Sequence, residues 1–108
     1  MVSLLAPAPY ITSLKMRKLR RRKQCLTILD QKIGGVQAAI EQATAELKRT
    51  KTERDTFVWQ TCSMSRDEEY ERTLHSFDQL SESLFDKLSG LRLELLHYSK
   101  RRSQLASR

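Results

Sequence analysis

The chain has 108 residues, with 20 lysine and arginine residues against 13 acidic ones, a net charge of +7. At this length we expect a single domain, and no apolar run approaches the ~18 residues that a membrane-spanning helix needs. The low content of glycine and proline, 3 and 2 residues, favours long helices over a compact globular fold.

The start of the chain is read as a lead followed by a basic segment. Residues 1–10 contain both prolines, Pro7 and Pro9, and are predicted to be disordered. Their apolar part precedes the positive part, which is the reverse of a secretory signal peptide. No acidic residue occurs before Asp30, so a mitochondrial transit peptide, and with it an organelle-targeted helical protein, is kept as an alternative.

A first helix is predicted over about residues 11–59, which contain no proline. Seam positions, along which two coiled-coil helices pack, alternate at spacings of three and four residues. They are Leu19, Arg22, Leu26, Leu29, Ile33, Val36, Ile40, Ala43, Leu47, Thr50, Arg54 and Phe57.

A turn is predicted at about residues 60–65, followed by a second helix over about 66–105. Ser65 and Glu68 have the spacing of a capping box at a helix start, which Asp67 and Glu69 also suit. The seam continues through Tyr70, Leu74, Phe77, Ser81, Leu84, Leu88, Leu91, Leu95, Tyr98, Arg102 and Leu105.

The predicted fold is all-α, a two-helix antiparallel coiled-coil hairpin. Matching the two seams places Leu26 beside Tyr98, Ala43 beside Ser81 and Arg22 beside Arg102, while a shift by one heptad stays open. Cys25 and Cys62 would lie roughly 55 Å apart, so no disulfide joins them. Gly34, Gly35 and Gly90 fall at one height and are either tolerated surface residues or a bend point.

Apolar residues outside the seam suggest further contact surfaces. Leu80, Phe85, Leu93 and Leu96 either widen the seam or meet another surface. Near the turn, three residues either close the end of the seam or form a tip that docks to a partner: Phe57, Trp59 and Met64.

Positive charge gathers at the predicted open end of the hairpin, where residues 15–23 and 98–108 meet. These segments hold eleven of the 20 basic residues and no acid, so the remaining 9 basic and 13 acidic residues carry −4. The like charges of Arg22 and Arg102 would favour an external anionic surface. The predicted binding residues are Lys15, Arg17, Lys18, Arg20, Arg21, Arg22, Lys23, Lys100, Arg101 and Arg102.

The nature of the anionic partner is narrowed by what the basic segments lack. No aromatic residue is interleaved with the arginines to stack on bases, so nucleic acid is not the expected partner, although a nucleic-acid-binding or scaffolding coiled coil is kept as an alternative. The apolar face is too weak for a membrane-surface helix, and no membrane insertion is expected.

Catalytic and cofactor chemistry is not expected. His75 and His97 would lie about 33 Å apart along one helix and cannot share a metal ion. The sequence contains no glycine-rich phosphate loop, and a hairpin with one seam offers no cavity around a reaction. The chain is therefore predicted to be no enzyme and to hold no cofactor.

Three segments resemble the stalk proteins of type III secretion, the YscO/FliJ family, with EscO-like members as the nearest: "MRKLRRRKQCLTILDQKI", "VWQTCS" and "YSKRRSQL". The resemblance covers about residues 15–106. It implies a cytoplasmic bacterial hairpin at the base of the secretion apparatus, with one end in the pore of the hexameric secretion ATPase. It also implies contacts with an export gate protein and secretion chaperones.

Overall fold

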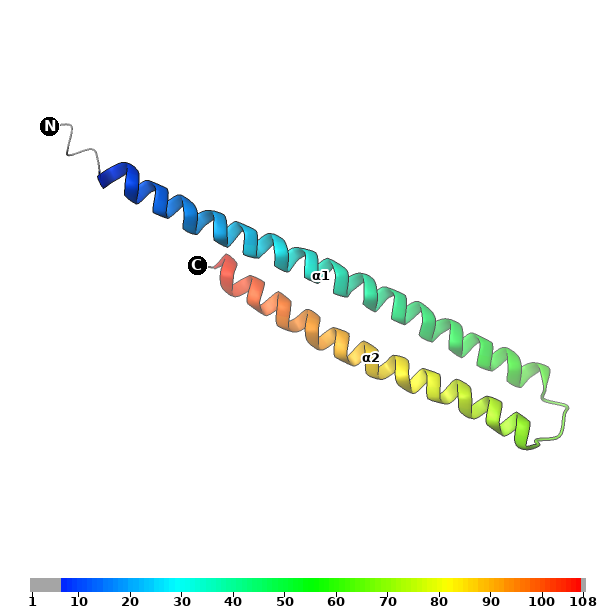
Figure 1. Cartoon of the computed structure of the whole chain (residues 1–108). Helices are drawn as coiled ribbons and strands as arrows, with labels where there is room; N and C mark the ends of the chain where they lie inside the picture. Colours follow the sequence, from blue (N-terminus) through cyan, green and yellow to red (C-terminus); the bar gives the residue numbers. More distant parts are fainter. Residues whose placement is uncertain (1–6, 108) are drawn as a thin grey trace. The chain divides into compact units, whose positions relative to one another are not determined.

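The computed structural model describes residues 7–107, and they form two helices. Helix α1 spans Pro7–Gln60 and α2 spans Glu68–Ala106, joined by a loop over residues 61–67 (Figure 1). No strand occurs in this described range, and the prediction of an all-α antiparallel hairpin is confirmed.

The chain divides into two units, and the division crosses both helices. The terminal unit combines the chain up to Gly34 with the chain from His97 onward. The loop unit runs from Gly35 to Leu96 and includes the loop. Each unit contains part of α1 and part of α2, and each is described separately below.

The loop unit has the better-buried seam. Every predicted seam position in it is buried or half-buried. Ala43 and Leu88 are the most buried, at 1% and 3% exposed. Thr50 is also buried, and its hydroxyl donates to the carbonyl of Glu46, so the seam accepts this polar residue without an unsatisfied group. The remaining buried residues of this unit are Val36, Tyr70 and Leu84.

The terminal unit has a thinner seam. Among its described residues only Leu29 is buried. Leu26, Ile33 and Tyr98 are half-buried. Leu19 was predicted on the seam but is 61% exposed, and Arg102 is exposed as well. The placement of Leu19 was therefore wrong, because α2 ends beside Arg22 and has no residue left to cover the preceding turn of α1.

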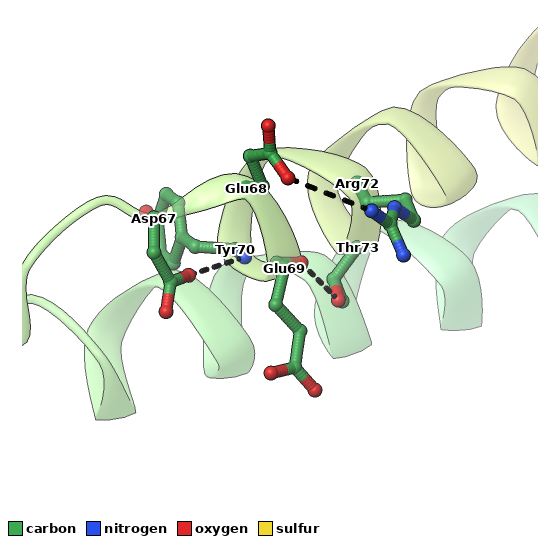
Figure 2. A network of polar contacts seen from close by, with 6 residues as sticks. All are labelled: Asp67, Glu68, Glu69, Tyr70, Arg72 and Thr73. Carbon is green, nitrogen blue, oxygen red and sulfur yellow. Dashed lines mark hydrogen bonds and ion pairs between the residues drawn. The ribbon is translucent and has the colours of Figure 1, made fainter.

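The helix boundaries differ slightly from the predicted ones. α1 begins at Pro7 instead of residue 11, since proline is tolerated in a first turn, whose N–H groups have no helical partner. The rest of the predicted lead, residues 1–6, lies outside the described residues. α2 begins at Glu68, and its cap is Asp67, whose Oδ1 accepts the Tyr70 amide at 2.9 Å (Figure 2).

The later start of α2 changes how the seams match. Arg54 of α1 pairs with Asp78 of α2 at 3.0 Å, about eight residues beyond the position that the predicted pairing of Ala43 with Ser81 implies for it, while Tyr70 stacks on Phe57 with ring centroids 5.4 Å apart. Within the terminal unit, Arg102 pairs with Asp30 and not with Arg22. In each unit the partner lies about one heptad from its predicted place. The first register was wrong, and the heptad shift that had stayed open describes both units.

The heptad step has a physical cause. A start of α2 that lies one or two residues later breaks the match between the seam positions of the two helices. Because each seam repeats every seven residues, the positions match again only when one helix is shifted along the other by a whole heptad. The pairing therefore advances by a whole heptad. In the loop unit, a register advanced by one heptad would pair Ala43 with Leu88 instead of Ser81, so that a large side chain would fill the space that a small one leaves. Their nearly complete burial fits that arrangement.

Candidate partner-binding surfaces

The first turns of α1 extend past the end of α2 within the terminal unit. The guanidinium of Arg22 donates from Nε to the carbonyl of Leu105 at 2.9 Å and from a terminal nitrogen to that of Ala106 at 3.1 Å. Ala106 is the last residue of α2. Residues 7–21 of α1 therefore precede the point at which α2 stops, a length of about 22 Å, and all side chains from Ser13 to Arg21 are exposed.

We call the exposed lysines and arginines of this end the basic surface. None of them forms an ion pair within the described part of the chain. They comprise Lys15, Arg17, Lys18, Arg20, Arg21, Lys23, Lys100 and Arg101.

The charge of the terminal unit is strongly one-sided. Its sequence contains twelve basic residues and one acidic residue, a net charge of +11, whereas the loop unit contains eight basic and twelve acidic residues, a net charge of −4. The single acid, Asp30, is hydrogen-bonded to Arg102. The hydrogen bond that Arg102 donates to the Asp30 carboxylate, aided by the negative charge of Asp30, raises the pKa of Arg102. No other carboxylate side chain of this unit can neutralise the basic surface.

Two residues predicted for partner binding have internal roles. Arg22 binds the last carbonyls of α2, where a positive charge also meets the negative end of the helix dipole. Arg102 joins α2 to Asp30 of α1. The predicted repulsion between Arg22 and Arg102 was wrong, because each has its own acceptor. The other eight predicted residues stay exposed.

Exposed apolar side chains lie beside the basic surface. Leu14, Met16 and Leu19 are 40%, 49% and 61% exposed on the same turns of α1. They lie among the basic residues along the sequence. A partner of this surface would therefore meet apolar area as well as positive charge.

The second predicted surface, near the loop, is only partly assembled. Phe57 stacks on Tyr70, and its ring centroid lies 6.0 Å from that of Phe77. Phe57 therefore closes the end of the seam, which was one of the two predicted alternatives. Phe57 and Met64 line a recess of about 250 Å³. Trp59 is 77% exposed and does not line it. We call this hollow the tip recess; its other lining residues are Thr61, Ser65, Asp67, Glu69, Tyr70 and Thr73.

The polar groups at the tip recess follow from the start of α2. Besides Asp67 at the cap, the hydroxyl of Thr73 donates to the Glu69 carbonyl, and Glu68 lies 4.0 Å from Arg72 (Figure 2). The guanidinium of Arg66 lies 5.8 Å from the ring centre of Tyr70. The carboxylates of Glu69 and Glu71 form no ion pair in the described structure.

A third surface belongs to α2 in the loop unit. The four apolar residues placed outside the seam are all exposed, between 50% and 68%: Leu80, Phe85, Leu93 and Leu96. The alternative in which these four residues widen the seam is therefore wrong. They form apolar area that α1 of this unit does not cover.

Sites for metals or membranes are not found in the described chain. Cys25 and Cys62 are both free and exposed. Residues 7–107 contain no group of three His, Cys, Asp or Glu side chains that could hold a metal ion. Neither helix, over the same residues, has a stretch long and apolar enough to cross a bilayer.

Asp30 is the functional neighbour that sequence reasoning missed. Its signal was present, since it is the only acid among the first 40 residues. It could be assigned to Arg102 only once the register was known.

Comparison with models of protein families, with curated proteins and with solved structures found no match.

Proposed function

We propose that this chain is a non-enzymatic central stalk of a type III secretion system. Its basic surface would enter the pore of the hexameric secretion ATPase and stimulate or coordinate ATP hydrolysis. The chain would also bridge to the export gate, and secretion chaperones are further candidate partners. In this role the protein works in the bacterial cytoplasm at the base of the apparatus.

One observation carries the proposal: a helical segment with strong positive charge lies beyond the end of α2 and has no acid beside it. An isolated helix of this length is only marginally stable in water. Burial in a partner would stabilise residues 7–21, and an acidic pore would offset the charge that the terminal unit leaves unpaired.

The chemistry of the basic surface suits an asymmetric fit. A single stalk in a ring of six subunits meets each subunit at a different angle. Electrostatic attraction acts over about 8–10 Å at physiological salt and tolerates such rotation better than a shaped apolar socket does. The exposed Leu14, Met16 and Leu19 would add apolar contact where the fit is closest.

The test is binding to the purified hexameric ATPase, measured together with its rate of hydrolysis. The variant Arg20→Glu/Arg21→Glu reverses charge on the basic surface and leaves Arg22 in place on α2. Two charge reversals at desolvated contacts should weaken binding by about tenfold or more and remove the stimulation. Added salt should weaken wild-type binding.

The matched control is Arg49→Glu/Lys51→Glu, which reverses the same number of charges at exposed positions of α1 in the loop unit. This control should bind and stimulate as the wild type does. Equal loss in both variants would mean that net charge alone matters, and no binding by the wild type at low salt would refute the proposal.

The second candidate function is a nucleic-acid-binding scaffold, which the +11 charge of the terminal unit favours. Retention on DNA that falls steeply with salt, combined with no effect on the ATPase, would support it. The absence of aromatic residues among the arginines of residues 15–23 argues for the stalk.

A further inference from the structure

The tip recess has an apolar interior and an open mouth. Phe57 and Tyr70 stack to form one wall, and Met64, at 65% exposed, stands beside it. Its volume of about 250 Å³ is large enough for a leucine or methionine side chain. A partner that buries an apolar side chain as exposed as Met64 lowers the free energy of the system, because apolar surface is removed from water.

The surroundings of the tip recess are acidic beyond what the helix start requires. Asp67 caps α2 with one carboxylate oxygen, and Glu68 stands near Arg72. Glu69 and Glu71 have no ion-pair partner in the described structure. Residues 57–73 contain four acidic and two basic residues, a net charge of −2. An occupant should therefore be both apolar and positively charged.

The chain itself contains such an occupant in residues 13–21 of α1. This segment carries exposed leucines, Leu14 and Leu19, among five basic residues and no acid, and α2 does not cover it. We propose that residues 13–21 of one copy dock at the tip recess of a second copy, with a leucine in the recess and arginines against Glu69 and Glu71. Opposite charge and apolar area then coincide on both sides of the contact.

The contact is heterologous, because it joins two different surfaces. A pair of copies retains one unused segment and one unused recess, so association continues from copy to copy. The basic surface of a copy bound in this way is covered. An acidic partner of that surface would have to displace the neighbouring copy, which regulates access to it. This inference goes beyond the proposed function and does not depend on it.

Sedimentation equilibrium of the full chain, without any other protein, tests the proposal. The wild type should show a weight-average mass that rises steadily above 12.6 kDa as the chain approaches about 1 mM, a range in which contacts with a Kd near 1 mM are detected. Salt at about 1 M should reverse the rise, because it shortens the range of charge interactions to about 3 Å.

Two variants separate the two sides of the contact. Glu69→Lys/Glu71→Lys reverses charge at the recess, and Arg20→Glu/Arg21→Glu reverses it on the segment. Each variant alone should associate at least about tenfold more weakly than the wild type does. An equimolar mixture should associate again, since one variant keeps an intact recess, the other keeps an intact segment, and the two reversed surfaces are themselves opposite in charge.

Further controls keep the outcome decisive. Met64→Ser removes apolar area in the loop without touching a helix and should also weaken association, while circular dichroism should show all variants equally helical. Leu93→Asn, on the exposed face of α2, should leave association unchanged. A monomeric wild type, variants that associate like the wild type, or association abolished only by Leu93→Asn would overturn the proposal.

Discussion

The two units of this hairpin use similar helices for different purposes. The loop unit buries Ala43, Leu84 and Leu88 almost completely and carries a net charge of −4. The terminal unit buries only Leu29 among its described residues and carries +11. Stability is thus concentrated where the two seams are complete, and unpaired charge is concentrated where α2 ends. The weakly packed unit is the one that has most to gain from a partner.

The largest expected effect lies in the seam of the loop unit. Leu88→Ala should lower the free energy of unfolding by about 2–5 kcal/mol, because Leu88 is almost completely buried and its truncation leaves a cavity in the seam. Leu93→Ala makes the same truncation on an exposed side chain of the same helix and should change stability by less than about 0.5 kcal/mol. Urea unfolding followed by circular dichroism measures both. Equal losses would show that the seam is not where the contrast between the units arises.

The next effect concerns the boundary between the units, where Gly34 and Gly35 adjoin. A Cβ atom at either position would meet nothing within 4 Å. Gly34→Ala and Gly35→Ala should each raise the free energy of unfolding by about 1 kcal/mol, since alanine favours the helix. Gly90→Ala, equally open, is the control. All three variants should be more stable than the wild type. If only Gly34→Ala and Gly35→Ala also bind the ATPase more weakly, the two glycines act as a bend point.

An effect of similar size is expected at the end of α2. Arg22→Ala removes two hydrogen bonds to the last carbonyls of α2 and should cost about 1 kcal/mol. Hydrogen exchange of the amides near Leu105 should rise with it. Lys23→Ala, at the neighbouring exposed position, should leave both unchanged. The same loss in both variants would contradict the internal role of Arg22.

The smallest effect is expected from Asp30→Asn, which removes the one acid of the terminal unit. Its pair with Arg102 is largely exposed, and such pairs contribute little to stability because water and salt screen them. The variant should lower stability slightly and strengthen binding to an acidic partner, since Arg102 is released. Titration with the ATPase at low salt measures this. Weaker binding would show that the pair orders the surface.

Heptad spacing predicted much of this contrast before the structure was known. The seam from Leu26 to Phe57 follows from spacings of three and four, because such residues share one face of a helix whatever lies opposite. The same pattern places Phe85 and Leu93 outside the seam, but whether they widen it was left open until their exposure was known. The concentration of positive charge in two segments is a direct property of the sequence.

Register and caps could not be predicted in the same way. Ser65 and Asp67 are both good caps, and choosing between them moves the start of α2 by two residues. That choice selects between two registers a heptad apart, which sequence periodicity does not distinguish. The roles of Arg22, Asp30 and Arg102 depend on that register. The partners of Arg22 and Arg102 across the helices were therefore missed, while the seam residues of each helix were found.

The basic segment of α1, residues 13–21, lies beyond the end of α2 in the terminal unit. Amide hydrogen exchange of the free chain, resolved residue by residue, tests it most directly. Residues 13–21 should exchange within about tenfold of an unfolded peptide, because a lone helix of this length opens readily. Residues 36–50 should exchange only on unfolding of the loop unit. Equal protection of both segments would contradict the account.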